Sequence, residues 1–196
     1  MRRKTTRIVS TPEPDIRFSL RGHVGRIVIA GSRAGNRFTP AMAVAFAEAC
    51  ERCEDEACHV VLLTAEGNDF CRGIEGNLAD WPPISGADFV AALARVTRPV
   101  VAALRGRVEA EGFELALAAD LRLVAPRTRL SLPQVARGAL PRFGGTQRLP
   151  RMVGAERALR LILLGEEMRG SEAVDLGLAM AASSRPELVA SRLAGT

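Results

Sequence analysis

Two glycine-containing turns, with a glutamate shortly after the second, hold the groups of this sequence best suited to chemistry. The first turn covers residues 67–74 and follows an apolar stretch, and the second covers residues 108–112, where a helix is expected to begin. Backbone N–H groups at the start of a helix have no acceptor within it and carry the positive end of its dipole. A pair of such donors aimed at one point would stabilise negative charge that develops on an oxygen atom.

The hydrophobic pattern predicts strands and helices that alternate along the chain. Strands are expected at 16–20, 26–30, 60–64, 100–104 and 121–124, and helices at 41–50, 87–95, 112–119, 154–164 and 171–176. The continuous apolar run at 60–64 is typical of a strand that is buried on both faces. The alternation indicates βαβ crossovers and a mostly parallel sheet, so the predicted fold class is α/β.

Length and composition favour one globular domain over residues 16–196, preceded by a flexible lead-in at residues 1–15. Pro12 and Pro14 discourage regular structure in that lead-in. No apolar run approaches the roughly 20 residues that span a bilayer, and no apolar stretch typical of a secretory signal follows the basic start. The expected location is the cytoplasm, with no membrane contact.

The net charge of +5 comes almost entirely from arginine, since Lys4 is the only lysine. These arginines are scattered, and aromatic residues make up only 4% of the chain. Single-stranded nucleic acids are usually bound on aromatic stacking platforms, so nucleic-acid binding is not favoured. The four cysteines, Cys50, Cys53, Cys58 and Cys71, lack a second ligand pair at zinc-like spacing and are interpreted as reduced, partly buried thiols rather than metal ligands.

Three spaced motifs carry a resemblance to a known family. They are Phe70-Cys71-Arg72-Gly73-Ile74-Glu75, the stretch from Gly106 to Ala116 ending at Asp120, and Pro133-Gln134 with Gly138, Pro141, Gly144-Gly145-Thr146, Leu149 and Arg151. Together they are similar to the crotonase (enoyl-CoA hydratase/isomerase) superfamily over roughly residues 16–180. The resemblance implies repeated ββα units with a mostly parallel sheet, and a domain that is C-terminally truncated relative to the family.

The resemblance also implies site residues. The backbone N–H groups of Ile74 and Glu111 would form an oxyanion hole for an acyl thioester, and Glu114 matches the first catalytic glutamate of the hydratases. Gln134 stands where the family has its second catalytic glutamate. Contacts with the substrate or its coenzyme A carrier are expected from the following residues: Arg33, Arg37, Arg72, Gly73 and Gly112.

The implied partner is a thioester of coenzyme A or of acyl carrier protein, as in fatty acid or polyketide metabolism, with no further cofactor and no metal. A homo-oligomer is expected, as a trimer or a hexamer. The chain departs from the family pattern at three site positions, since Gln134 replaces a glutamate and Ala110 and Glu111 replace glycines of the second turn. Gln134 cannot exchange a proton, and the Glu111 side chain is expected to point away from the oxyanion hole or to have a raised pKa, because an anion there would oppose an enolate.

Several functions remain open at this point. Hydration or dehydration of an enoyl thioester and double-bond isomerisation are both compatible with Glu114 as the sole acid and base. The alternatives are an acyl-thioester decarboxylase and a non-catalytic paralogue that serves as a binding or scaffold partner. Every catalytic interpretation fails if the two amides face apart or are already bonded within the protein.

Overall fold

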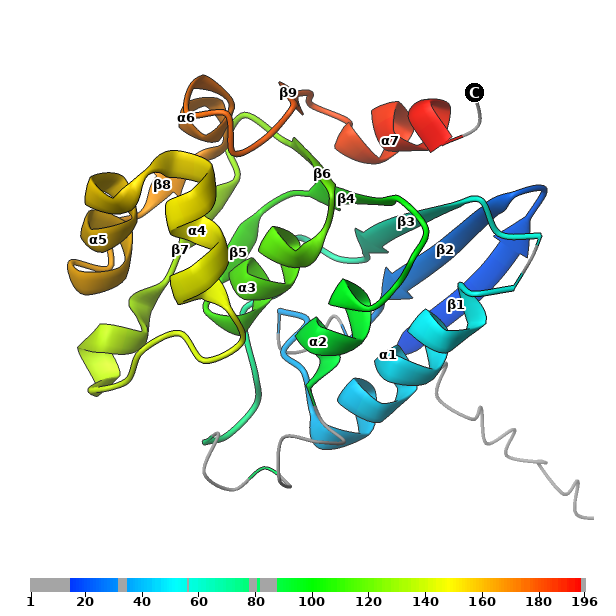
Figure 1. Cartoon of the computed structure of the whole chain (residues 1–196), viewed down its shortest axis with the longest axis horizontal. Helices are drawn as coiled ribbons and strands as arrows, with labels where there is room; N and C mark the ends of the chain where they lie inside the picture. The colour runs from blue at the N-terminus through cyan, green and yellow to red at the C-terminus, as the bar shows by residue number, and fades with distance from the viewer. Residues whose placement is uncertain (1–14, 32–34, 56, 78–80, 82–87, 195–196) are drawn as a thin grey trace, which may run out of the picture.

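A six-stranded, mostly parallel sheet forms the centre of the computed structural model, which describes residues 15–31, 35–55, 57–77, 81 and 88–194 (Figure 1). Its spatial order is β1-β2-β3-β4-β6-β9, and only the β1–β2 hairpin is antiparallel. The strands are β1 (Ile16–Arg21), β2 (Val24–Ile29), β3 (Val60–Ala65), β4 (Val100–Leu104), β6 (Leu121–Val124) and β9 (Ala181–Ala182). The predicted α/β class with a mostly parallel sheet is therefore confirmed.

Both faces of the central strands are covered, which explains their apolar sequences. All five residues of β4 are buried, and so are the last five of β3. The helices α1 (Pro40–Arg52), α2 (Phe89–Ala94) and α3 (Glu111–Ala118) pack on one face, and α7 (Pro186–Ala194) packs against β3, β4 and β6. Removal of this apolar surface from water is the main force that holds the layers together.

A second, smaller sheet lies beside the first and was not predicted. It joins β5 (Arg107–Glu109) in parallel to β7 (Arg129–Ser131), and β7 in antiparallel to β8 (Met168–Arg169). Strands of two or three residues are too short to show a period in the sequence. The outer elements η3 (Pro133–Arg137), α4 (Gly145–Val153), α5 (Ala155–Leu163) and α6 (Gly170–Asp175) complete this side of the molecule (Figure 1).

Two helices of the structure, α4 and α7, were not predicted. Helix α4 begins with Gly145 and contains Pro150, two residues that disfavour helices in isolation, so its sequence looks like a loop. Helix α7 follows a stretch with no clear pattern. Almost all of the predicted lead-in, residues 1–14, lies outside the described residues, and within the described part no helix is long and apolar enough to cross a membrane.

Helix α3 touches the 70–74 segment directly, without an intervening side chain. The first turn of the helix contains Gly112, and a Cβ atom added there would overlap the backbone carbonyl of Cys71. The backbone of Gly112 has no positive φ, so the need for glycine at this position is purely steric. This contact sets the distance between the two turns that hold the predicted site.

Gly112→Ala should therefore destabilise the protein through backbone overlap, by about 3 kcal/mol, because neither the helix nor the segment can give way like a flexible side chain. Gly22→Ala is the matched control, since Gly22 has a φ of 58° but nothing within 4 Å of its added Cβ. That control should cost only about 1 kcal/mol of backbone strain. Urea denaturation of the two variants compares the costs, and equal losses would contradict the steric role of Gly112.

Candidate active site

The amide of Ile74 is aimed at α3 by the peptide bond that it shares with Gly73. The Gly73 carbonyl oxygen accepts a hydrogen bond from the Phe38 amide at 2.9 Å. A trans peptide holds its C=O and N–H on opposite sides, so the Ile74 N–H must point away from Phe38. Gly73 has a φ of 93°, a conformation that glycine adopts without strain.

The direction of the Glu111 N–H, at the start of α3, is likewise set by the peptide bond that it shares with the preceding residue. Its peptide partner is the Ala110 carbonyl, which accepts hydrogen bonds from the amides of Phe113 and Glu114 at 2.9 and 3.1 Å. The Glu111 N–H therefore points backward out of the helix, where no intrahelical acceptor exists. Ala110 itself has φ 52° and ψ −124°, which costs a non-glycine residue roughly 1–3 kcal/mol of strain.

The side chain of Glu111 does not point away from the predicted oxyanion hole. Its Oε2 accepts a hydrogen bond from the Ile74 N–H at 3.2 Å. Of the two alternatives expected for this carboxylate, the one in which it points away is wrong. One of the two proposed donors is thus already bonded within the protein, to an oxygen that itself carries negative charge.

Backbone bonds lock the two turns to each other. Cys71 and Val108 form a parallel bridge, and the Glu109 amide donates to the Cys71 carbonyl at 2.9 Å. The Asp69 carboxylate accepts from the Arg107 amide at 2.9 Å. Because β3 and β4 are adjacent parallel strands, the turns that follow them leave the same edge of the sheet, and these bonds hold them together.

Glu114 is fully buried on the next turn of α3, and one of its oxygens is saturated with donors. The Oε1 atom accepts from the amides of Phe143 and Gly145, both at 2.8 Å. Gly145 opens α4, so its N–H lies at the positive end of that helix. The remaining oxygen, Oε2, faces Gln134, and the Arg142 backbone donates a further hydrogen bond to this carboxyl group.

Burial raises the pKa of the Glu114 carboxyl from 4.5 to about 7, against the lowering effect of the hydrogen bonds from Gly145 and Phe143. The nearby Glu111 carboxylate raises this pKa further. An acid with a pKa near neutrality exists in both protonation states at physiological pH. That property is what a general acid or base requires.

Gln134 lies in η3, is also buried and contacts Glu114. Its Nε2 lies 3.4 Å from the Glu114 Oε2, and its own Oε1 is buried without a hydrogen-bond partner. Glu114 and Gln134, predicted from separate motifs 20 residues apart, are therefore brought together. The unpartnered oxygen of Gln134 could accept a bond from a water molecule or from a protonated Glu114.

Two of the arginines predicted to contact coenzyme A are bonded to groups within the protein. The Arg37 Nη1 donates to the carbonyls of Arg72 and Ile74, at 2.7 and 3.4 Å. These bonds stabilise the backbone of the first turn. The Arg72 Nε lies 3.0 Å from the Glu109 Oε2. Arg33 lies outside the described residues, and a phosphate contact by any of these arginines stays a prediction.

Sequence reasoning missed three groups that shape the site. Glu109 pairs with Arg72 and with Arg107, whose Nη1 lies 2.5 Å from the Glu109 Oε1. Burial raises the pKa of the Glu109 carboxyl, but the two arginines outweigh that effect and lower the pKa overall. The amides of Phe143 and Gly145 anchor Glu114. The Gly144-Gly145-Thr146 motif could have indicated the Gly145 amide, since a glycine lets the backbone approach a buried group closely.

The four cysteines are all buried free thiols, and burial raises the pKa of Cys53 and of Cys71 to about 12. Such thiols are unreactive at neutral pH. Within the ranges that the structure describes, no group of three or more His, Cys, Asp or Glu residues is arranged to hold a metal ion.

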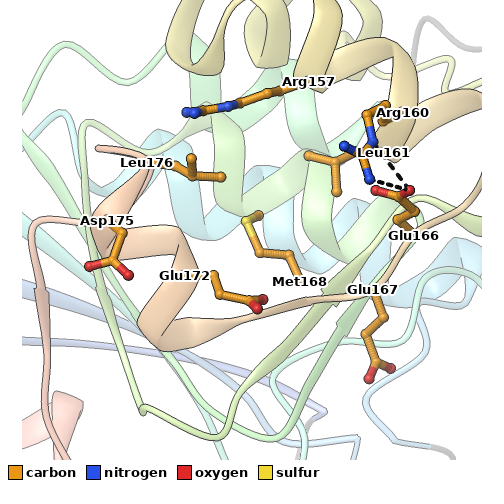
Figure 2. A pocket seen from close by; sticks show the side chains of 9 residues that line it. All are labelled: Arg157, Arg160, Leu161, Glu166, Glu167, Met168, Glu172, Asp175 and Leu176. Carbon is orange, nitrogen blue, oxygen red and sulfur yellow. Dashed lines mark hydrogen bonds and ion pairs between the residues drawn. The ribbon is translucent and has the colours of Figure 1, made fainter.

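A cavity of about 430 Å³ lies away from these groups, between α5, β8 and α6 (Figure 2). It has a floor of Leu161, Met168 and Leu176, and charged side chains at its rim. Arg160 is already paired with Glu166 at 2.9 Å across that rim. None of the predicted site residues lines this cavity, so it does not bear on the chemistry of Glu114.

Comparison with known proteins gives consistent matches. The model of the enoyl-CoA hydratase/isomerase family matches residues 21–194. A Bacillus subtilis protein named as a probable enoyl-CoA hydratase is 35% identical over 140 residues, which cover 65% of this chain and 54% of that protein. The chain thus spans about half the length of this curated relative.

Solved structures agree in fold. A Geobacillus kaustophilus enoyl-CoA hydratase subunit superposes with a TM-score of 0.85 and 31% identity, covering 93% of this chain and 74% of that one. A Thermobifida fusca protein assigned as an enoyl-CoA hydratase, in complex with acetoacetyl-CoA, gives a TM-score of 0.82 and 26% identity, covering 92% and 79%.

Glu114→Gln should remove a pH dependence of stability. Below pH 4.5 the Glu114 carboxyl is protonated in both states, whereas between 4.5 and about 7 only the unfolded chain loses the proton. The free energy of unfolding of the native protein therefore falls across this window, by roughly 3 kcal/mol in total. Relative to it, the variant should gain stability from pH 4.5 to 7 in urea titrations. The control is Glu48→Gln at an exposed site of α1, and a pH-independent difference for Glu114→Gln would contradict the raised pKa.

Proposed function

This chain belongs to the enoyl-CoA hydratase/isomerase family, the crotonase superfamily, and on that basis we propose that it acts on an enoyl or 3-hydroxyacyl thioester. The observation that carries the proposal is the buried Glu114, whose pKa is about 7 and whose Oε1 is held by the amides of Phe143 and Gly145. It lies one helical turn beyond the predicted amide pair. A base and an anion-binding site are therefore adjacent.

Isomerisation of a double bond needs only these two features. The Glu114 Oε2 removes a proton from the carbon next to the thioester carbonyl, and the electron pair moves onto the carbonyl oxygen as an enolate. The amides of Ile74 and Glu111 stabilise that charge. The protonated Oε2 then returns the same proton to the carbon two positions further along, as the electrons move back from the oxygen.

Hydration is the second reaction that the site supports, and the buried Oε1 of Gln134 favours it. An oxygen without a partner can accept a hydrogen bond from a water molecule and so orient it. The water adds hydroxide to the β-carbon of the enoyl thioester, and its proton goes to Glu114. Glu114 then passes a proton to the α-carbon, which balances the addition with one carboxylate.

A non-catalytic protein that binds acyl thioesters is the alternative, and the Glu111 side chain favours it. While its carboxylate accepts from Ile74, the amide pair is not open to a thioester oxygen. This bond meets one of the conditions under which the catalytic interpretation was expected to fail, so catalysis requires the Glu111 carboxylate to move away from the Ile74 amide. Coenzyme A as the carrier is supported by the related Thermobifida fusca complex, whereas a homo-oligomer, a cytoplasmic location and the absence of a further cofactor stay predictions.

Glu114→Gln should lower turnover of crotonyl-CoA hydration and of but-3-enoyl-CoA isomerisation by about 10²–10⁴-fold, since the amide cannot transfer a proton. In the native protein, kcat/KM for isomerisation should rise with pH up to about 7 and then level off, because the base must be ionised. Steady-state assays measure both. Turnover unaffected by Glu114→Gln would overturn the mechanism, and absent turnover with tight acyl-CoA binding would favour the alternative.

Gln134→Glu should distinguish the two reactions. A second carboxyl beside Glu114 would let separate groups handle the protons of the water and of the α-carbon. We expect crotonyl-CoA hydration to rise about tenfold or more, in line with one general acid or base, while isomerisation does not increase. Gln134→Leu is the companion variant, and it should lose hydration selectively. A rise in isomerisation alone would contradict the assigned role of Gln134.

A further inference from the structure

The Glu111 carboxylate occupies the position that the proposed function gives to the thioester oxygen. Its Oε2 lies 3.2 Å from the Ile74 nitrogen. A Cβ atom built on Gly73 would lie 2.5 Å from the same oxygen, so the carboxylate rests directly against the Gly73–Ile74 peptide. A thioester oxygen that accepts from Ile74 would have to take the same place.

The two oxygens are not equal competitors. A hydrogen bond from an amide to a carboxylate is roughly twice as strong as one to a neutral carbonyl. A ground-state thioester oxygen is neutral and must enter from solvent to reach the Ile74 amide. The Glu111 carboxylate is part of the protein and already lies beside that amide. The Glu111 carboxylate is therefore the favoured acceptor of the Ile74 amide, unless other parts of the ligand contribute additional binding energy.

The carboxylate is also free to leave. Glu111 is partly exposed, unlike the fully buried Glu114. The neighbouring cations Arg72 and Arg107 both pair with Glu109 instead. Rotation of the Glu111 side chain toward solvent would thus break one hydrogen bond and no ion pair among the described residues, and it would remove one of the charges that raise the Glu114 pKa.

We infer that Glu111 is a specificity-determining internal occupant of the acyl-oxygen position, which an acyl thioester must displace in order to bind. This inference rests on the proposed function for the identity of the ligand. The apparent affinity for the thioester is lowered by the fraction of molecules in which the position is open. Free coenzyme A has no acyl oxygen, so its binding does not depend on Glu111.

The test compares dissociation constants of butyryl-CoA and of free coenzyme A by calorimetry. Glu111→Gly removes the carboxylate and keeps the backbone N–H, and it should tighten butyryl-CoA binding about tenfold or more. Its effect on coenzyme A should stay below about twofold. Glu111→Gln, which keeps the length without the charge, should give a smaller gain. Glu156→Gly, the same change in the first turn of α5, is the matched control and should give none.

Unchanged or weaker butyryl-CoA binding by a Glu111→Gly protein that melts cooperatively would overturn the inference. A second measurement, hydrogen exchange of the Ile74 amide by NMR, needs no ligand. That amide should be protected in the native protein and lose protection in Glu111→Gly, and equal protection in both would also overturn it. If butyryl-CoA binds to neither protein, the proposed function fails, and the exchange result alone then decides the role of Glu111.

Discussion

The parallel pairing of β3 with β4 is the constraint on which the rest of this molecule depends. Adjacent parallel strands send the chain out at the same edge, so the segments after Ala65 and Leu104 meet there. The Cys71–Val108 bridge then fixes their spacing, and Gly112 lets α3 lie against the Cys71 backbone. A shift of one residue in the β3–β4 register would move every side chain of the shifted strand to the opposite buried face and would change the distance between the two amides.

Backbone groups, rather than side chains, do most of the positioning at this edge. The Phe38 amide sets the direction of the Ile74 N–H, and the amides of Phe143 and Gly145 fix one oxygen of Glu114. Main-chain donors have few degrees of freedom, so they lose little entropy when a substrate arrives. Such preorganised donors are the usual source of strong charge stabilisation in enzymes.

The sequence predicted the mostly parallel sheet, and it selected Glu114 and Gln134, which lie together in the structure although their roles stay predictions. It could not predict the directions of the side chains. The continuous apolar run of β3 is a local signal that predicts its strand directly. Helix α4 begins with Gly145 and contains Pro150, so its sequence does not indicate a helix, although the Gly145 amide donates to Glu114 in the structure. The direction of Glu111 is set by a partner 37 residues away, and a spacing rule alone could not reveal it.

Two of the departures from the family pattern, Glu111 and Gln134, act on the same few atoms and are linked by charge. Glu111 already places a second carboxylate close enough to raise the pKa of Glu114. A glutamate at position 134 would add a third acid around one buried point, and like charges in a low dielectric repel strongly. Gln134 contacts the same Oε2 at 3.4 Å without adding charge, and its amide donates to that oxygen. The neutral Gln134 therefore leaves two carboxylates, rather than three, around this buried point, and in Gln134→Glu the repulsion would favour keeping one of the acids protonated.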